Sequence, residues 1–394
     1  MRIFYASSPT PNAWMGVPSK LWRDNLYLPL LDLGHDVAEF IYDYRKITDY
    51  WNTKDKNRDD LTSELMRQTR AAHSDKSIDL FFSYFYDRFV FPKAIDKIRG
   101  MGIKTVNWYC NGSYQLDLVS EISPHYDWCL VPEKWRINDY IQMGANPIYC
   151  QEAANPQIYR PYRVPLEFDV TFVGQRYGDR PRYIKCLLDH GIDIRVWGLG
   201  WHVHSAQSAG LTELPKFQSA MLIGRKLLTW QGLQAAAKRA CGFLSGSTKR
   251  GGGASGQCGS GYDIPPSILG GPLSDVEMIK MFSRSKINLG FSSCGETHQD
   301  DDRILQIRLR DFEVPMSGGF YIVEYMKELE EFYEIGKEVV CYTGPEDLSE
   351  KIKYYLAHET ERETIRKAGH ERCLRDHTWQ KRFQTVFQQI GLAD

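Results

Sequence analysis

Short apolar segments rich in β-branched and aromatic residues alternate with amphipathic or polar segments along most of the chain. Apolar runs of this length, bounded by glycine or polar residues, predict strands, and the stretches between them predict helices. Strands that alternate with helices pair in parallel, so the sequence predicts doubly wound α/β domains. The predicted strands are residues 2–6, 35–42, 78–86, 104–109, 128–132, 147–150, 168–173, 192–197, 285–293, 320–323 and 338–342.

Composition limits the size and the partners of the fold. A chain of 394 residues with 42% hydrophobic and 25% charged residues is long enough for two domains. The net charge of −1 gives no bulk attraction to nucleic acid or to an anionic membrane, although a local basic patch would still allow nucleic acid to bind. Nucleic acid is therefore an unfavoured partner.

Nine cysteines are scattered along the chain without a Cys-x-x-Cys pair. An odd number in so long a chain favours reduced thiols over a disulfide framework. The start of the sequence shows no export signal, and no apolar run reaches membrane-spanning length. We therefore expect a cytoplasmic protein without a membrane span.

The segment 303–324 is the most informative stretch. Residues 303–316 have apolar positions at helical spacing, a serine and two glycines predict the end of the helix, and 320–323 predict a buried strand. Arg310 and Glu313 stand at i, i+3 and therefore project from the same helix face. The guanidinium can bind a phosphate and the carboxylate can accept hydrogen bonds from two hydroxyls. The alternative is an ordinary surface ion pair.

The same segment opens an ordered series of motifs that resembles a known family. The series is Arg310-x-Phe-Glu-x-Pro-x-x-Gly-Gly-Phe, Gly336-Lys-Glu-Val-Val, Tyr342-Thr-Gly-Pro-Glu-Asp-Leu and Ala368-Gly-His-Glu-Arg-Cys-Leu-Arg-Asp-His-Thr-Trp. It resembles the C-terminal half of the CgeB-like (spore maturation) glycosyltransferases over about residues 165–390. The resemblance implies the GT-B fold, in which two Rossmann-like domains face an interdomain cleft. It also implies a nucleotide-sugar donor whose ribose is held by Glu313.

Domain boundaries follow from proline placement together with the resemblance. The stretch 153–161 has two prolines and no apolar period, which favours a linker, and we place the hinge at about 151–167. We expect an acceptor-side domain at residues 1–155 and a nucleotide-sugar-binding domain at 156–375. A closing helix is predicted at residues 361–389. Its last part, at about 375–390, would cross back to the first domain, as the resemblance implies.

Residues 202–267 depart from the family pattern and are interpreted as an insertion. Its first half is helical in character, and its second half is too rich in glycine to pack well. It is either a lid or acceptor-specificity element over the cleft, or a tolerated surface insertion.

The second domain is expected to bind the donor. A strand, a glycine turn and a helix follow one another at 168–187. Free N–H groups at the Gly174 turn and at the N-terminus of the following helix suit an anion, with charge added by Arg176. This pattern is common, so the phosphate role depends on the matching position in the resemblance. Arg303 and Arg310 are expected to stabilise the departing diphosphate. The other donor-binding residues that we expect are Gln175, Trp197, Gly198, Leu273, Ser292 and Glu313.

The first domain is expected to hold the acceptor. Trp14 and Asn111 follow predicted strands, and loops at the carboxyl ends of strands face the ligand crevice. GT-B enzymes often keep a histidine or an aspartate where this chain has Asn111, so the general base is left open. Asp117 is the main candidate and His125 is a weaker one.

The acidic loop before residue 303 invites a metal interpretation that we do not favour. Asp300-x-Asp302, with His298 nearby, resembles the metal motif of the other large transferase class. However, acidic residues before a helix favour its positive end, and the GT-B resemblance implies that arginine and a helix dipole neutralise the diphosphate. We therefore expect no metal and no cofactor.

Together these features predict a metal-independent glycosyltransferase that moves a sugar from a nucleotide-diphosphate sugar to a hydroxyl acceptor of unknown class. One alternative is a phage-type transferase that acts on a DNA base, which needs a basic groove. Another is a catalytically inactive GT-B binding module, which the asparagine at position 111 suggests. An inactive module would release no free nucleoside diphosphate from a donor.

Overall fold

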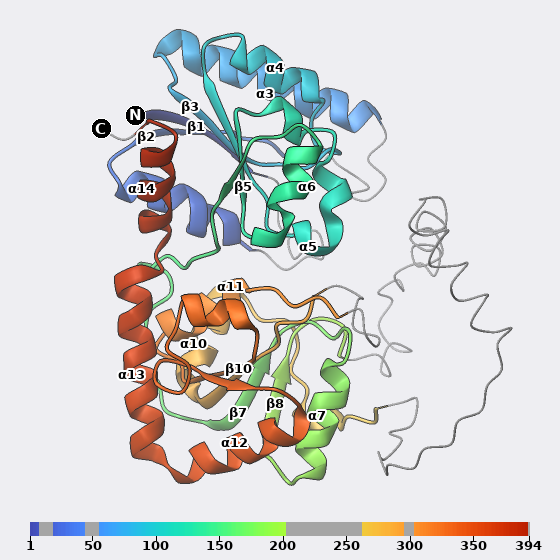
Figure 1. The fold of residues 1–394 in the computed structure, drawn as a ribbon, viewed down its shortest axis with the longest axis vertical. Coiled ribbons are helices and arrows are strands. Elements are labelled where there is room, and N and C mark those ends of the chain that lie inside the picture. The colour runs from blue at the N-terminus through green and yellow to red at the C-terminus, as the bar shows by residue number, and fades with distance from the viewer. Residues whose placement is uncertain (8–18, 44–54, 202–261, 295–302, 393–394) are drawn as a thin grey trace, which may run out of the picture. The chain divides into compact units, whose positions relative to one another are not determined.

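The computed structural model describes residues 1–7, 19–43, 55–201, 262–294 and 303–392, with only the backbone for 55–57. These residues contain two β-sheets, drawn in Figure 1. The first sheet has the strand order β2-β1-β3-β4-β5-β6, and the second has the order β11-β10-β9-β7-β8. Every pairing within the two sheets is parallel. The predicted α/β class is confirmed.

The first sheet and its helices come from the N-terminal part of the chain. Its strands are β1 (Arg2–Ser7), β2 (Asp36–Glu39), β3 (Leu80–Tyr84), β4 (Lys104–Trp108), β5 (Trp128–Val131) and β6 (Pro147–Tyr149). The helical segments between them are η1 (Arg23–Tyr27), α2 (Leu28–Asp32), α3 (Asp55–Asp75), α4 (Pro92–Arg99), α5 (Gly112–Gln115), η3 (Leu116–Val119), η4 (Ser123–His125), η5 (Lys134–Arg136) and α6 (Ile137–Gln142).

The second sheet follows after residue 167. Its strands are β7 (Phe168–Val173), β8 (Ile194–Trp197), β9 (Ser285–Gly290), β10 (Tyr321–Glu324) and β11 (Val340–Tyr342). The helical segments that the structure describes here are α7 (Arg180–Asp189), η6 (Pro266–Ile268), α10 (Asp275–Arg284), α11 (Leu309–Met316), η8 (Lys327–Glu331), α12 (Pro345–Ala357), α13 (Glu359–Asp376) and α14 (Trp379–Gln389).

The first sheet carries one hydrophobic core, which the last helix of the chain completes. Phe82 of β3 meets Phe383 of α14 with ring centroids 5.4 Å apart. Trp108 of β4 meets Trp379 edge to face at 5.1 Å, and both indoles are fully buried. The chain therefore returns to the first sheet after it has built the second, which Figure 1 shows in red at α14.

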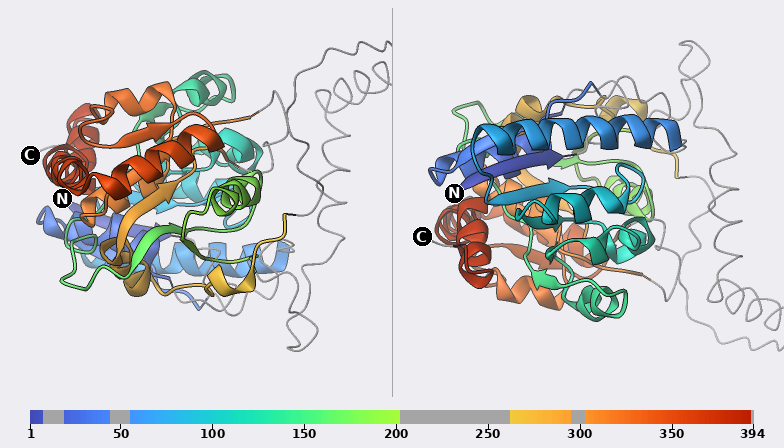
Figure 2. Two further views of the ribbon diagram at one scale, coloured as in Figure 1. Left: turned by 90° about the horizontal axis from the view of Figure 1, so that it is seen from below. Right: turned by 90° about the horizontal axis from the view of Figure 1, so that it is seen from above.

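The second sheet has a separate core on each face. Successive side chains of a strand point to opposite faces. Ile322 and Val340 pack in one core with α7 and α12, whereas Val323 and Cys341 pack in another with α10 and α11. The two further views in Figure 2 show helices flanking these strands. Both faces are covered, as parallel sheets require.

The helix predicted from residue 303 begins only at Leu309. Before it, Cys294 N donates to Ile304 O at 3.0 Å and Gln306 N donates to Ser292 O at 3.0 Å, so this segment is extended beside the end of β9. The apolar residues Ile304, Leu305 and Ile307, in a segment of only six residues, fit a helical and an extended pattern equally well. The early start of the predicted helix was therefore wrong.

The single closing helix predicted for residues 361–389 is two helices. The chain breaks between α13 and α14, where Ala154 N donates to His377 O at 3.2 Å and Thr378 forms an isolated bridge with Ala154. The Thr378 hydroxyl then caps α14 by accepting from Lys381 N at 3.3 Å. This break is where the chain passes from the second sheet to the first.

Residues 1–201 and 264–394 form one compact unit that contains both sheets. Within it, Asn25 of η1 donates to the Tyr159 hydroxyl at 3.1 Å, and Tyr149 of β6 donates to Glu328 of η8 at 3.2 Å. No helix in the described part of the chain is long and apolar enough to span a bilayer.

Replacing Trp379 with Ala should lower the free energy of unfolding by about 3–5 kcal/mol, because a fully buried indole leaves a cavity against Trp108. Urea unfolding followed by circular dichroism measures the change. The control is Leu374→Ala, which removes a side chain that is 44% exposed on α13 and should change stability by less than about 1 kcal/mol. Similar losses in the two variants would contradict the packing role.

Candidate functional site

The turns after β7 and β8 lie against each other at the carboxyl end of the second sheet. Gly174 N donates to Trp197 O at 2.9 Å, and Arg176 N donates to Leu199 O at 2.9 Å. Both of these amides are therefore already bonded, so an anion at this turn would have to meet other N–H groups. The side chains of Gln175 and Arg176 are exposed at this turn.

Gly198 is required by the close approach of these turns. Its φ of +136° lies in the left-handed region, and an added Cβ would stand 2.2 Å from Gly174 O. Trp197 does not face the turn, because its ring packs 5.1 Å from Phe168 at the start of β7. The backbones of Gly174, Trp197 and Gly198 therefore lie side by side. The Trp197 indole packs on the sheet and does not face the turn.

Arg310, which is half-buried, and the fully buried Glu313 form an ion pair beside the same turn. Arg310 Nη1 binds Glu313 Oε2, and Arg310 Nε donates to Val173 O at 3.5 Å. The Glu313 side chain is fully buried, so the pair is not the ordinary surface ion pair of the alternative interpretation. Glu313 Oε1 is buried and accepts no hydrogen bond of normal geometry from the described residues. The Tyr159 hydroxyl interacts with this carboxylate, so a further donor would share it with Tyr159.

A tyrosine lies close to this carboxylate. Burial raises the pKa of Tyr159 well above its usual value, and the negative charge of Glu313 adds to the rise. The same hydroxyl accepts a hydrogen bond from Asn25, which belongs to the helical segment before α2. Residues of the first sheet's half of the chain therefore reach the neighbourhood of Glu313.

Two arginines converge on one phenol oxygen at the end of β7. Arg180 Nη2 donates to the Tyr177 hydroxyl at 2.5 Å, and Arg308 Nη2 donates to the same oxygen at 3.3 Å. Arg308 also donates to Ser293 O at 2.6 Å, and Arg180 to Gln175 O at 2.9 Å. Neither guanidinium has a carboxylate within ion-pair distance among the residues whose positions are described. Uncompensated guanidinium groups of this kind suit a phosphate.

The charge states of these arginines follow from their surroundings. Burial lowers the pKa of Arg180 to about 10, so it remains charged at neutral pH, and its guanidinium lies 3.7 Å from the centre of the Tyr177 ring. Burial also opposes the charge of Arg308, but the groups around it, Tyr177 first, raise its pKa overall. The end of β7 therefore holds two positive charges.

The carboxyl ends of the first sheet contribute buried acids. Glu133, just after β5, is 4% exposed, and its Oε1 accepts from Ser113 N at 3.2 Å and from the Ser113 hydroxyl at 3.4 Å. Burial raises the pKa of Glu133 to about 7. Burial raises the pKa of Glu152, just after β6, well above its usual value, and the charge of Arg308 opposes this rise. Acids of the first sheet thus lie near an arginine of the second.

A narrow crevice lies beside Glu133. It encloses about 210 Å³ of empty space when open solvent is counted, and its walls stand too close together for a water molecule to fit between them. Pro132, Glu133, Trp135 and Gln151 come from the first sheet's half of the chain. The opposite wall is formed by Gln306, Ile307 and Glu328. Polar groups from both halves of the unit therefore face one opening.

Three of the predicted donor residues have structural partners. Arg303 pairs with Asp179 at 3.0 Å and with Glu324 at 2.6 Å, so two carboxylates already balance its charge. The buried Ser292 hydroxyl donates to Glu324 O at 2.8 Å and ties the ends of β9 and β10. Leu273 is half-buried against the core of α10 and α11. None of these contacts reaches the two arginines at Tyr177.

The predicted acceptor-side residues are dispersed. Asn111 is half-buried, and its side-chain oxygen accepts from the Tyr114 hydroxyl at 3.4 Å. Asp117 is exposed in η3. Trp14 lies outside the described residues, as do His298, the Asp300-x-Asp302 motif and most of the predicted insertion at 202–267. Within the described ranges no three metal-ligating side chains cluster together.

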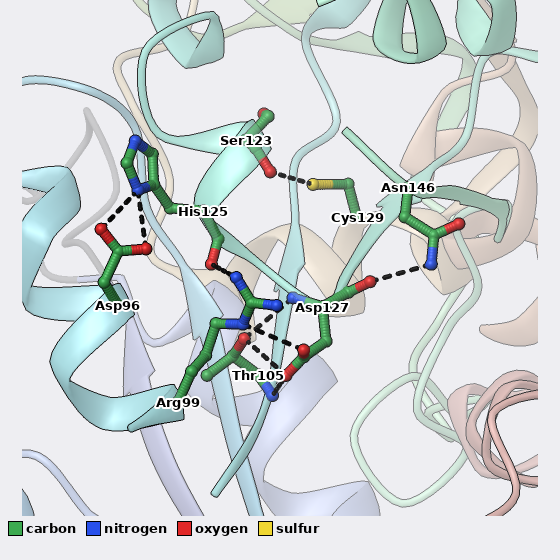
Figure 3. Close-up of polar contacts among 8 residues, drawn as sticks. All are labelled: Asp96, Arg99, Thr105, Ser123, His125, Asp127, Cys129 and Asn146. Carbon is green, nitrogen blue, oxygen red and sulfur yellow. Dashed lines mark hydrogen bonds and ion pairs between the residues drawn. The ribbon is translucent and has the colours of Figure 1, made fainter. Parts of the chain in front are cut away.

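His125, the weaker candidate base, lies at the opposite end of the strands. Its ring binds Asp96 at 2.9 Å, and its backbone oxygen accepts a hydrogen bond from Arg99 at 3.3 Å (Figure 3). Arg99 also binds Asp127, which receives a hydrogen bond from Thr105 N at the start of β4. These contacts join the amino ends of β4 and β5, so His125 is not at the carboxyl edge where the other candidates meet.

Four polar residues of this region were not among the predicted site residues. Glu133 and Glu152 each follow a predicted strand closely, and the rule that ligands meet the carboxyl ends of parallel strands would have pointed to both. Arg308 is a charged residue within an apolar segment, which is a signal of a buried functional group. Arg180 had no comparable signal, because it resembles any polar residue at the start of a helix.

Comparison with known proteins identifies the architecture. Residues 250–388, about a third of the chain, match the model of a family described as glycosyl transferase-like. No curated protein sequence matches the chain. Sucrose-phosphate synthase from Thermosynechococcus elongatus is similar in structure, with a TM-score of 0.57 and 11% identity over 100% of both chains. The chain has the GT-B fold.

Two further GT-B neighbours are similar over nearly their whole length. Anabaena HepE, solved in complex with UDP-glucose, has a TM-score of 0.56 and 10% identity over 99% of each chain. A glycosyltransferase from Rickettsia africae has a TM-score of 0.54 and 10% identity, and the match covers 99% of this chain and 98% of that one. At such low sequence identity, the structural similarity establishes the fold alone. The reaction has to be inferred from the site residues.

Replacing Gly198 with Ala should lower the free energy of unfolding by about 3 kcal/mol, since the new Cβ clashes with Gly174 O and the φ of +136° strains an alanine. Gly271→Ala is the matched control, because a Cβ there meets nothing within 4 Å, and it should change stability by less than about 0.5 kcal/mol. Chemical denaturation compares the two. Equal denaturation midpoints for Gly198→Ala and Gly271→Ala would show that the turns after β7 and β8 can move apart to accept the new Cβ.

Proposed function

We propose that this protein is a glycosyltransferase that moves a sugar from a nucleotide-diphosphate sugar to a hydroxyl acceptor. The proposal depends on one observation: Arg180 and Arg308 both donate hydrogen bonds to the Tyr177 hydroxyl. Neither arginine has a carboxylate within ion-pair distance among the described residues. Two guanidinium groups without an acidic partner suit a diphosphate, because negative charge develops on the diphosphate when the nucleotide leaves. They stand at the carboxyl end of β7, where doubly wound folds bind ligands.

Glu313 suits the ribose of the same donor. Its carboxylate is buried, one oxygen is held by Arg310, and the other accepts no hydrogen bond of normal geometry from the described residues. A ribose offers two adjacent hydroxyl donors, and hydrogen bonds to a carboxylate are among the stronger ones. In this proposal Arg310 fixes the carboxylate beside the Gly174 turn, and Arg176, Gln175 and Gly198 line that turn.

Catalysis in this proposal comes mainly from stabilising the leaving group. As the bond between the anomeric carbon and the phosphate oxygen breaks, negative charge grows on the diphosphate, and fixed guanidinium groups stabilise that charge without reorganising. Arg308 and Arg180 supply these guanidinium groups, so we propose that sugar transfer needs no metal. Arg303 is assigned no direct part, because Asp179 and Glu324 already bind it.

The comparisons support this proposal at the level of the fold. Residues 250–388 match a glycosyl transferase-like model, and HepE, a GT-B neighbour, was solved with UDP-glucose. The motif series from Arg310 onward supports a relation to the CgeB-like group, which we include in the proposal. Buried acids beside Arg308 favour an enzyme over an inactive binding module.

A donor screen by thermal shift tests the proposal. UDP-, GDP- and dTDP-sugars should include at least one that raises the melting temperature, whereas CMP-sugars, with a single phosphate, should have less effect. At a ligand concentration of about 100 times Kd, stabilisation is about 2.7 kcal/mol. The shift should persist in EDTA. No stabilisation by any of the diphosphate donors would contradict the proposal.

Glu313→Gln should weaken binding of the best donor by about 10- to 100-fold, because the charge-assisted hydrogen bonds to the ribose are lost. Isothermal titration calorimetry measures the dissociation constant. Glu64→Gln removes the acid of another i, i+3 pair, with Arg67 on α3, and is the matched control. It should leave binding unchanged. Unchanged binding in Glu313→Gln, with the fold intact by circular dichroism, would remove the ribose role.

A further inference from the structure

Arg180, one of the two arginines assigned to the donor diphosphate, is covered by other side chains in this structure. It is only 7% exposed. Its Nη1 donates to Gln175 O at 2.9 Å, and its Nη2 donates to the Tyr177 hydroxyl at 2.5 Å. Its Nε is buried and has no hydrogen-bond partner among the described residues. A diphosphate therefore gains little contact with this guanidinium until a group that covers it moves.

Three aromatic rings surround the Arg180 guanidinium, and one of them lies near the surface. The guanidinium carbon is 3.7 Å from the centre of the Tyr177 ring, 5.2 Å from that of Phe172 and 5.6 Å from that of Phe291. Phe172 and Phe291 are buried in a core of the second sheet. Tyr177 is half-buried in the turn between β7 and α7, and both of its neighbours along the chain are exposed. Of the three rings, only that of Tyr177 can move without opening the core.

The Tyr177 hydroxyl lies between the two arginines, where a phosphate oxygen would accept hydrogen bonds from both. It accepts from Arg180 Nη2 at 2.5 Å and from Arg308 Nη2 at 3.3 Å. A phosphate oxygen accepts the same bonds and adds a negative charge, which a neutral phenol does not have. A phosphate also has several acceptor oxygens, and the Nε atoms of both arginines are buried without a partner in the described chain. The phenol is therefore the weaker of two possible partners for these donors.

We propose that Tyr177 closes the arginine pair in the ligand-free protein, and that the diphosphate of the donor displaces its side chain. This inference rests on the proposed glycosyltransferase function and adds a binding step that precedes sugar transfer. The diphosphate takes over the hydrogen bonds that Arg180 and Arg308 donate to the phenol, and the Tyr177 hydroxyl turns to solvent. No covalent bond changes in this exchange.

The backbone on both sides of Tyr177 is anchored, so the exchange is a rotation of one side chain. Before it, Arg176 N donates to Leu199 O at 2.9 Å. After it, Arg182 N donates to Asp179 O at 2.9 Å in the first turn of α7. A tyrosine side chain moves between staggered rotamers without changing the backbone. The turn can therefore keep its contacts with the end of β8 while the phenol leaves the arginines.

The exchange makes the arginine pair selective for ligands of high negative charge. When only a fraction of the protein is competent to bind, the apparent affinity of every ligand falls by that fraction. A diphosphate offsets this cost through its charge, because it meets two guanidinium groups. A sugar hydroxyl or a water molecule is no better an acceptor than the phenol and gains nothing by displacing it. Tyr177 thus keeps the pair for the diphosphate.

Tyr177→Phe tests the proposal, because it removes the competing hydroxyl and keeps the ring that packs on Arg180. Isothermal titration calorimetry of the full-length protein with UDP, GDP and dTDP gives the Kd of the probe that binds best. The variant should bind that probe about tenfold more tightly than the wild type, which must first break two hydrogen bonds from charged groups. Tyr325→Phe is the matched control. It removes a hydroxyl that donates to Glu330 at 2.7 Å just after β10, and it should leave the Kd within about twofold.

The stability of the ligand-free protein separates a displaced residue from a merely structural one. Loss of the hydrogen bonds from Arg180 and Arg308 should lower the melting temperature of ligand-free Tyr177→Phe, while its affinity for the nucleoside diphosphate rises. A hydroxyl that only supports the fold predicts a lower melting temperature with unchanged or weaker affinity. In an Arg308→Gln background the gain from Tyr177→Phe should shrink, because one of the two bonds to the phenol is already absent.

The outcomes separate this inference from the proposed function. Unchanged or weaker binding by Tyr177→Phe overturns the inference, and the proposed function stands if the wild type still binds a nucleoside diphosphate. An equal gain in Tyr325→Phe also overturns the inference. Binding by Tyr177→Phe with none by the wild type supports it. No binding of any of the three probes by either protein refutes the diphosphate site, and the inference falls with it.

Discussion

The candidate site depends on two guanidinium groups that both donate hydrogen bonds to the hydroxyl of Tyr177. Arg180 and Arg308 are held by neutral oxygens, and no carboxylate lies within ion-pair distance of either in the described chain. A fold selected only for stability gains little from paired cations kept together without an anion. Their position at the carboxyl end of β7 suits the diphosphate that the proposed function requires.

Two buried acids follow strands of the first sheet, and burial raises the pKa of both. Glu133 and Glu152 follow β5 and β6, and the charge of Arg308 acts on Glu152. The parallel topology explains the meeting, because every strand of a parallel sheet presents its carboxyl end at the same edge. Both sheets present such an edge, and residues from both halves of the chain line one crevice.

The connection between the two sheets depends on the end of the chain. The break at His377 and Thr378 lets α14 leave the second sheet and place Trp379 against Trp108. The apolar pattern of residues 361–389 is continuous through this break, so periodicity alone predicted one helix. The helix is broken instead, because Ala154 N donates a backbone hydrogen bond to His377 O. Ala154 lies more than two hundred positions away in the sequence. The same kind of distant pairing, with the end of β9, delayed the start of α11.

The sequence by itself determined the alternation of strands and helices, the parallel sheets and the i, i+3 pairing of Arg310 with Glu313, because these follow from local periodicity and spacing. It also placed the Gly174 and Gly198 turns at the ends of their strands. Only the tertiary structure decided that the amides of Gly174 and Arg176 are already bonded, that Arg303 is neutralised by two acids, and that Arg308, Glu133 and Glu152 come together. Those facts depend on contacts between distant segments, and burial and electrostatic pairing arise only when such segments meet.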